Sequence, residues 1–511
     1  MSPRFVDIGE AVAAIADGST VATDGFTMMG VAEAVLAGVA ASFQERGHPR
    51  DLTIVHASGQ SDRVGGLEHF AVDGLVRRVV GSHWGLMPRM SAFLHRGGAE
   101  AVCLPQGQIS TLYRAIAAGR PGNLSKIGLG TFVDPRLGGG KVNGPSRASA
   151  PDYVQLTTVG DEEYLLYTTF PIDVAIIRAT TVDDHGNCTQ EEEAVTLDAL
   201  AIAQAAHNSG GVVICQAKKR APAGSLPPKA VVVPGCLVDL VVLTPDPERQ
   251  HRQTHSASFD ARYVSASTVA SVASAPIDGA RAAVGRRAVR FLRQGDIVNL
   301  GTGVPGDTVG SALVEAHLID SVTLTVESGV YEGTPAGGVD FGIAAWPSAI
   351  IGHPTQFDFY NGGGLDATFM GAGQIDRLGN VNVSLLGPRV IGCGGFIDIV
   401  QSTRRVYFCF TFQGRNAKFV DAVDHLTFSA EQALRSGQEV HYITERAVFR
   451  LERDGLLLIE IAPGVDLERD ILALIPFSIR VADPLAIGSP FPGEKTPKTE
   501  FTFAEEQGGI Q

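Results

Sequence analysis

The 511-residue sequence is poor in the features that mark membrane proteins, disulfide-rich secreted proteins and nucleic-acid-binding proteins. It has no run of about 18 uninterrupted apolar residues, which excludes a membrane-spanning helix. Its six cysteines include no C-x-x-C pair and no histidine at metal-ligand spacing, so neither disulfides nor a structural zinc site is expected. With a net charge of −14, the chain lacks the concentration of lysine and arginine that a nucleic-acid partner requires.

The first residues also lack the pattern of a secretory signal. Such a signal needs a basic start followed by an apolar stretch, and Asp7 and Glu10 stand in its place. We therefore expect a cytoplasmic protein with no membrane partner.

Length and glycine content are the first positive features. Single hydrophobic cores stop growing at roughly 250 to 300 residues, so a chain of 511 residues is expected to form two domains. The chain has 60 glycines, nearly twice the usual share of roughly 7%. Many of them cluster in short motifs, where backbone N–H groups can approach an anionic ligand closely.

Short β-branched runs separated by helical patterns indicate an α/β fold. Strands are predicted at 173–177, 211–215 and 238–243, and a helix at 194–207 ends before the sequence NSGG. Strands that are apolar on both faces and alternate with helices are typical of a largely parallel sheet. The predicted architecture is two similar open-sheet α/β domains, present as tandem diverged copies.

Composition places the domain boundaries. The apolar periodicity fades between Pro245 and Pro276, and a new amphipathic helix begins after Asp278. The last residues are rich in proline, glycine and charge. We predict an N-terminal domain at 1–245, a linker at 246–277, a catalytic C-terminal domain at 278–488 and a tail at 489–511.

The two expected domains share three short segments in the same order. Residues 17–21 before Gly25 match 294–298 before Gly301, residues 52–59 match 324–329, and the D-x-x-G-N sequence at 183–187 matches that at 376–380. Each match is weak alone, but chance rarely preserves the order of all three.

Glu327 has the position of a functional acid in the second copy. Residues 322–326 (VTLTV) are predicted to form a strand, and the sequence ESG follows directly. The carboxylate thus lies at the carboxyl end of a parallel strand, where open α/β sheets bind ligands. The first copy has His56 or Ala57 at the matching place, so the acid is not needed merely to build the turn.

A glycine-rich segment, GCGGF at 392–396, follows in the same copy. Glycines let backbone N–H groups turn toward one point and hold an oxyanion without a positive side chain. A carboxylate held against a thioester carbonyl gains from proximity, which can lower a barrier by about 7 to 11 kcal/mol. The combination suits acyl transfer.

These segments resemble the family I coenzyme A transferases of the acetate, propionate and 3-oxoacid type. The family's catalytic E-x-G corresponds to 327–329, and its G-x-G-G-F corresponds to 392–396. Further matches are LPQG at 104–107, GLGTFVDPR at 128–136, NLGTGVP at 299–305 and FYNGGGLD at 359–366. The resemblance covers about residues 7 to 480.

The resemblance implies an active site at the junction of two similar domains. CoA would move from an acyl-CoA donor to a small carboxylic acid by a ping-pong reaction, through a glutamyl-CoA thioester on Glu327. The other implied site residues are Gln106, Gly392, Gly394 and Gly395 for catalysis, and Gly301, Thr302, Gly303, Val304, Pro305 and Phe396 for substrate binding. CoA is then substrate and covalent intermediate, no metal or other cofactor is expected, and a homo-dimer or homo-tetramer is implied.

Two departures from the family bear on substrate preference rather than on reaction type. Glu332 stands where family members usually have glycine, and Asp24 to Phe26 replace a glycine-rich segment. Lys218 to Arg220 are expected to form a solvated charged face rather than a phosphate site. His185 and His353 have no partner at a meaningful spacing and are expected to be structural or exposed.

Three other functions remain as alternatives. An acyl-CoA hydrolase would use the same glutamate. An NAD-dependent oxidoreductase is suggested by GTGVPG at 301–306, with Glu327 about 20 residues further on as the ribose-binding acid. Against it, Pro305 is expected to disturb the entry to the helix, and the loop at 392–396 stays unexplained. A sugar-phosphate isomerase or a ligand-sensing regulator is the third.

Overall fold

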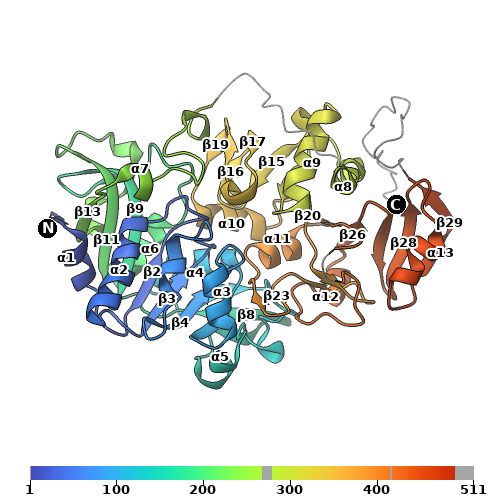
Figure 1. Cartoon of the computed structure of the whole chain (residues 1–511), viewed down its shortest axis with the longest axis horizontal. Helices are drawn as coiled ribbons and strands as arrows, with labels where there is room; N and C mark the ends of the chain where they lie inside the picture. The colour runs from blue at the N-terminus through green and yellow to red at the C-terminus, as the bar shows by residue number, and fades with distance from the viewer. Residues whose placement is uncertain (1, 267–278, 415–416, 489–511) are drawn as a thin grey trace.

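The computed structural model of the chain describes residues 2–266, 279–414 and 417–488. Two large sheets, one from each half of the chain, form its framework and follow one another along the longest axis (Figure 1). The expected linker at 246–277 is described only to residue 266, and the expected tail at 489–511 lies outside the described residues. The described part of the linker buries His251, Gln253 and Thr254. The domain boundaries stay predictions.

The first sheet is parallel along its main path. Its strands lie in the order β1 (Arg4–Val6), β13 (Leu240–Leu243), β11 (Val212–Ala221), β9 (Val174–Asp183), β2 (Thr20–Thr23), β3 (Leu52–His56), β4 (Val76–Gly81) and β5 (Glu100–Cys103). The short strands β10 (Cys188–Thr189) and β12 (Val231–Val233) add antiparallel pairs at β9. The strands predicted at 173–177, 211–215 and 238–243 are confirmed as β9, β11 and β13.

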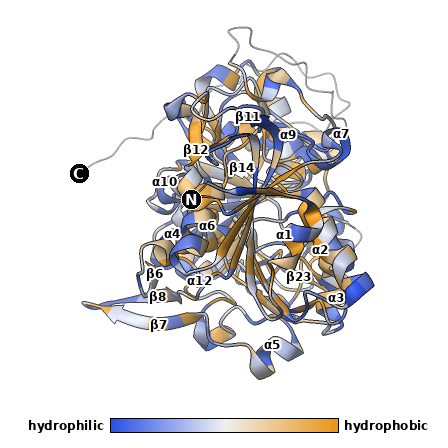
Figure 2. Ribbon diagram, turned by 90° about the vertical axis from the view of Figure 1, so that its left-hand side faces the viewer, coloured by the Kyte–Doolittle hydropathy of each residue, from blue (hydrophilic) through white to orange (hydrophobic). Residues whose placement is uncertain are grey.

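Helices cover both faces of this sheet, whose central strands are apolar (Figure 2). The helices α1 (Ile8–Ala13) and α2 (Glu33–Arg46) lie on one face, and α4 (Gln106–Ala117) and α6 (Ala199–Asn208) lie on the other. The remaining helices of this half are α3 (Pro88–His95), α5 (Gly144–Ser149) and α7 (Pro247–Gln250), and β6 (Gly122–Ser125), β8 (Glu162–Thr168) and β7 (Val154–Val159) form a small separate sheet.

The second sheet is parallel in its centre, is flanked by antiparallel pairs on both sides, and ends at one edge in a parallel pair of β28 with β29. Its order is β19 (Ala349–Ile350), β16 (Val330–Tyr331), β15 (Thr323–Val326), β14 (Ile297–Leu300), β20 (Ala367–Met370), β25 (Arg405–Cys409), β26 (Glu439–Ile443), β27 (Ala447–Glu452), β28 (Gly455–Ile461) and β29 (Arg480–Ile487). Its helices are α8 (Ala280–Ala288), α9 (Val304–Glu315), α10 (His353–Asn361), α11 (Phe396–Ser402), α12 (Ala430–Arg435) and α13 (Leu467–Asp470). Short hairpins are β17 (Thr334–Pro335) with β18 (Ala344–Ala345), β21 (Gln374–Ile375) with β22 (Val381–Asn382), and β23 (Leu385–Leu386) with β24 (Arg389–Val390).

The two sheets share a five-strand parallel core, which confirms the predicted repeat. The order β3-β2-β9-β11-β13 in the first matches β15-β14-β20-β25-β26 in the second. The repeated D-x-x-G-N turns also make the same bonds. Asp183 accepts from the backbone and side-chain N–H groups of Asn187, and Asp376 accepts from those of Asn380. The α/β class with two similar units is therefore observed.

One helix begins later than its apolar pattern predicts. The helix expected at 194–207 starts at Ala199, because Leu197 has a φ of 51°, outside the right-handed helical region. Glu193 is also held away from a helix by a buried ion pair with Arg178. The helix predicted after Asp278 is confirmed as α8.

The hydrophobic core is continuous across the junction of the two units. Ile109 and Leu112 on α4 belong to the same buried cluster as Phe357 on α10 and Ile397 on α11. A separate cluster packs α8 and α9 against the second sheet. The walls of any site between the units are thus held by close packing. No helix in the described ranges is long and apolar enough to cross a membrane.

Candidate active site

A cavity of about 440 Å³ lies where the carboxyl end of the second sheet faces the first unit. The predicted site residues that line it are Gln106, Gly301, Thr302, Glu327, Gly392, Gly394, Gly395 and Phe396. The first unit also contributes Phe26, His83 and Leu86. The fold thus brings together residues that the sequence separates widely.

The three other predicted residues lie outside this cavity. Gly303 lines an adjoining cavity of about 300 Å³, and Thr302 lines both. Val304 and Pro305 form the first turn of α9, where Pro305 is buried and Val304 packs against the second core. Their side chains line neither cavity, so their contact with CoA stays a prediction that the cavity walls do not support. The expectation that Pro305 disturbs the helix was wrong, because proline is tolerated in a first turn.

Glu327 directly follows strand β15, as predicted, and it lines the cavity. The residue is 8% exposed, and Asn299 donates from Nδ2 to its Oε2 at 3.4 Å. Burial raises the pKa of Glu327, while its own backbone N–H and the amide of Asn299 act in the opposite direction. The sequence match had included Asn299 without giving it a role. Its partner Glu327 lies on the neighbouring strand, so the register was needed to see the contact.

Strand register shows which residue of the first copy corresponds to Glu327. Val21 pairs with Ile54 in the first sheet, and Val298 pairs with Leu324 in the second. Counting three residues further along each strand places Ala57 at the position in the first copy that is equivalent to Glu327 in the second. The first copy therefore has no carboxylate at this point.

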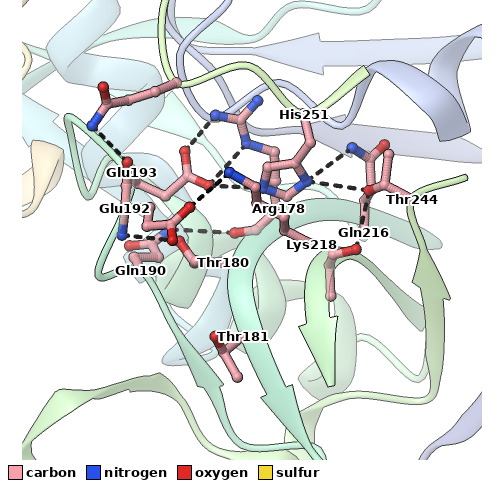
Figure 3. A network of polar contacts seen from close by, with 12 residues as sticks. Arg178, Thr180, Thr181, Gln190, Glu192, Glu193, Gln216, Lys218, Thr244 and His251 are labelled. Carbon is pink, nitrogen blue, oxygen red and sulfur yellow. Dashed lines mark hydrogen bonds and ion pairs between the residues drawn. The ribbon is translucent and has the colours of Figure 1, made fainter. Parts of the chain in front are cut away.

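A polar network fills part of the carboxyl edge of the first sheet instead (Figure 3). Arg178 on β9 forms a buried ion pair with Glu193, which also contacts Nε2 of His251 at 3.0 Å. Gln216 on β11 and Thr244 both approach the other ring nitrogen of His251. These side chains satisfy one another at the ends of β9 and β11. The ends of β2, β4 and β5 lead instead to the cavity residues Phe26, His83 and Gln106.

The loop at 392–396 is held by backbone hydrogen bonds within the second unit and to the first unit. The N–H of Gly392 donates to the carbonyl of Ser384 and the N–H of Gly394 to that of Ser82, each at 2.9 Å. The N–H of Gln106 donates to the carbonyl of Gly394 at 3.0 Å. Among the described residues, the N–H of Gly395 has no partner. Of the three glycines predicted to be catalytic, Gly392 and Gly394 thus use their N–H groups within the protein, and the N–H of Gly395 stays available.

A chain of buried side chains extends from the cavity across the junction. Nε2 of Gln106 lies 2.8 Å from Nε2 of His353, and Nδ1 of His353 lies 2.7 Å from the carboxylate of Asp198. His353 is fully buried, and its partners come from the first unit. Of the two expectations for His353, exposed or structural, burial excludes the first. Its two partners could not be seen from sequence spacing, because both are far away in the sequence.

The segment from Asp24 to Phe26, where the sequence departs from the family, contacts this series of hydrogen-bonded side chains and forms part of the cavity wall. Asp24 is buried, and its Oδ1 accepts from the backbone N–H of Asp198 at 3.1 Å. Burial and the neighbouring Asp198 raise the pKa of Asp24 well above its usual value. Phe26 lines the cavity directly. This segment therefore supports both the polar chain and the apolar wall.

Two further titratable groups lie beside the loop. Asp398 on α11 accepts from the N–H of Gly107 and from Nε2 of Gln108, both at 2.9 Å, and burial raises its pKa to about 6. It ties the helix that follows the loop to the first turn of α4. His83 lines the cavity, and burial lowers its pKa to about 4. Its ring is therefore neutral near pH 7.

The charged residues singled out in the sequence lie outside the cavity. Glu332 is exposed, has a φ of 57° and does not line the cavity, so it is not placed to select an acid. Lys218 and Lys219 pair with Glu192, and Arg220 with Asp184. This agrees with a charged surface rather than a phosphate site.

Comparison with known proteins agrees with this geometry. A coenzyme A transferase family model matches residues 5–244. A caffeate CoA-transferase of Acetobacterium woodii is 40% identical over 500 residues, which cover 93% of this chain and 94% of that protein. The acetate CoA-transferase YdiF of Escherichia coli K12 is 39% identical over 473 residues, with 88% and 87% covered.

A solved structure extends the similarity to the fold. A crystal structure of the acyl-CoA transferase YdiF from Escherichia coli O157:H7, described as a thioester complex with CoA, has a TM-score of 0.89 to this chain. The two chains are 37% identical in sequence, and the match covers 95% of each. The arrangement of the two units is therefore shared with a protein of known structure.

Proposed function

The chain belongs to the coenzyme A transferase family and is an enzyme, and we propose that it transfers CoA through a covalent thioester on Glu327. One observation carries the proposal. Among the described residues, Glu327 is the only carboxylate that lines the cavity between the two units. The thioester complex described for YdiF supports the same kind of intermediate.

The proposed reaction balances in two half-reactions. A carboxylate oxygen of Glu327 attacks the acyl-CoA carbonyl, giving an acyl-glutamyl anhydride and CoA thiolate. The thiolate attacks the glutamyl carbonyl, which releases the donor acid and leaves the glutamyl-CoA thioester. The acceptor carboxylate then attacks this thioester, and the same steps in reverse form the new acyl-CoA and restore Glu327. The reaction needs no metal and no nicotinamide.

The cavity walls supply the groups that this sequence of steps requires. Asn299 orients the nucleophile, and the burial that raises its pKa also removes the water that would shield it. The unpaired N–H of Gly395 and the second amide N–H of Gln106 are donors for the oxyanions of the tetrahedral intermediates. Gly395 is close enough that a Cβ built on it would lie 3.7 Å from Cγ of Glu327.

The substrates we propose are an acyl-CoA and small carboxylic acids. The named relatives include enzymes for caffeate and for acetate, so their names do not select one acid. We also propose a cytoplasmic homo-dimer or homo-tetramer, which light scattering on the purified protein tests.

The covalent step is tested by incubation with acetyl-CoA and no acceptor. The peptide that contains Glu327 should gain the mass of CoA less one water, and borohydride should then inactivate the enzyme. Glu327→Gln should prevent the modification, whereas Glu332→Gln, five residues away and outside the cavity, should not. An unmodified peptide in the active wild-type enzyme would refute the mechanism.

The same experiment separates the two enzymatic alternatives. Steady loss of acetyl-CoA without an acceptor would favour a hydrolase over a transferase. The dinucleotide alternative rests on the loop from Gly301 to Gly306, and the family assignment does not favour it. A change in NADH fluorescence on mixing would revive it.

A further inference from the structure

His353 and Asp198 are buried behind Gln106, which lines the cavity. Gln106, His353 and Asp198 are 3%, 0% and 4% exposed. The side chain of Asp198 also accepts a hydrogen bond from the hydroxyl of Ser110. Because His353 and Asp198 lie outside the cavity, the hydrogen-bonding role of each is set by its neighbours.

The direction of the hydrogen bonds follows from the acid at the end of the chain. Oδ2 of Asp198 is an acceptor 2.7 Å from Nδ1 of His353, so Nδ1 is the donor in this contact. The other nitrogen, Nε2, then has a lone pair and accepts from the amide of Gln106. One N–H of this amide is bonded to His353, and the second has no partner among the described residues. Asp198 therefore determines, through His353, which end of the Gln106 amide is the donor.

Gln106 cannot hold this orientation by itself. A glutamine side chain can turn its amide over and exchange its oxygen with its NH₂ group at little steric cost. An oxygen turned toward a developing oxyanion would repel it, whereas an N–H stabilises it. The first turns of α4 and α10 hold Gln106 and His353, while Asp198 precedes α6. These three hydrogen-bonded side chains therefore come together only when the two units are in contact.

We propose that Asp198 and His353 are positioning residues, which hold the Gln106 amide with its donor end toward the reacting carbonyl. The proposal rests on the function assigned above, since it concerns the oxyanions of that reaction. Asp198 fixes the tautomer of His353, and His353 fixes the amide. Neither residue lines the cavity, so both act through Gln106.

The test is a double-mutant cycle on single-turnover thioester formation. His353→Phe keeps a ring in place but removes the acceptor, and the rate should fall roughly 100-fold, as for the loss of one oxyanion donor. The KM for acetyl-CoA should stay within twofold. In a Gln106→Met background the same substitution should cost less than about twofold, because the group through which it acts is already gone.

A nearly isosteric variant covers the case in which His353→Phe does not fold. Asp198→Asn no longer imposes one tautomer, so the rate should fall by up to roughly 100-fold, the effect of losing one oxyanion donor, again only when Gln106 is present. Thr244→Val removes a hydrogen bond from the buried His251 in the other network and should leave the rate unchanged. A loss that persists in the Gln106→Met background, or no loss at all, overturns the proposal. Absence of the thioester in the wild-type protein would instead overturn the assigned function.

A separate observation concerns Lys418. It is the only lysine or arginine among the described residues that line the cavity. Its Nζ donates to the carbonyl of Ala372 at 2.7 Å, and it forms no ion pair with a described carboxylate. Burial lowers its pKa, as expected for a cation without a counter-ion. An ammonium group has three donors, so two are left for a ligand.

The sheet sets the distance between this cation and the nucleophile. Ala372 follows β20 and Glu327 follows β15, with β14 between them. Two strand spacings of about 4.8 Å separate these strands by about 10 Å. Val383 and Leu386 line the same cavity as Lys418 and give it apolar surface.

We infer that Lys418 binds an anionic oxygen of a substrate, about 10 Å from Glu327. This also rests on the assigned function. The oxygen belongs either to a CoA phosphate or to the far end of a dicarboxylic acid, and Lys418→Met distinguishes them. A rise of about tenfold or more in the KM for acetyl-CoA identifies the phosphate. A similar rise in the KM for glutarate, but not for pentanoate, identifies the acid. Lys229→Met, at an exposed lysine, is the control, and no change above twofold in any of these KM values overturns the inference.

Discussion

Replacing Gly392 by alanine tests whether contact with the first unit seats the loop beside Glu327. Gly392 has a φ of 83°. A Cβ at this position would lie 2.2 Å from the carbonyl oxygen of Ser82 and 2.9 Å from Cα of His83. Both are backbone atoms of the first unit, so they cannot move aside as the end of a flexible side chain would. The loop itself has to shift.

The structure allows the cost to be worked out. A left-handed backbone costs a residue with a Cβ roughly 1 to 2 kcal/mol. A shift of about 1 Å, needed to restore a normal contact, also weakens the bonds from Gly392 and Gly394 to Ser384 and Ser82, at about 0.5 to 1.5 kcal/mol each. The free energy of unfolding should therefore fall by about 2 to 5 kcal/mol. Misplacement of the loop by about 1 Å should also lower kcat roughly 100-fold.

Urea unfolding and the rate of CoA transfer measure the two effects. Gly437→Ala is the matched control, because Gly437 has a φ of 72° but no atom within 4 Å of its Cβ position. The control should lose only about 1 to 2 kcal/mol and keep its normal kcat. Equal losses of stability in the two variants, with a normal kcat for Gly392→Ala, would refute the reasoning.

Three further predictions concern single side chains. Glu327→Asp withdraws the carboxylate by one methylene, so kcat for CoA transfer should fall at least about 100-fold with little change in melting temperature; a near-normal rate would contradict the role of the nucleophile. Burial raises the pKa of Asp398 to about 6, so its protonated form stabilises the folded protein. This stabilisation is fully present below the pKa of the same group in the unfolded chain, near 4, and is lost as the pH rises through 6. Asp398→Asn should therefore flatten the fall in unfolding free energy between pH 4 and 7, and an unchanged slope would argue against it. Glu332→Gly relieves a φ of 57° and should stabilise the fold by about 0.5 to 1 kcal/mol without altering the preference among acids, measured by urea unfolding and a panel of short-chain acids.

Local signals in the sequence were enough to determine the fold class and the position of the nucleophile. The strands around 173–177 and 322–326 are short apolar runs bounded by turn residues, and such patterns depend on neighbours in the chain. The repeat then placed Glu327 at the end of a strand whose counterpart carries His56 or Ala57, and the strand register of the structure selects Ala57. The resemblance to a family added the reaction, and the relatives agree with the transfer of CoA. The covalent role of Glu327 stays a prediction.

Only the tertiary structure decided which groups around Glu327 are available. His353 meets Gln106 and Asp198 across the junction of the two units, and no spacing in the sequence encodes contacts between elements so far apart. Likewise, all three glycines of the loop have the same chemistry, but packing against Ser82 and Ser384 uses two of their N–H groups. Hydrogen bonds of this kind are satisfied by whichever partner the fold brings near. The sequence alone therefore located the acid, and the fold determined which donors can act on it.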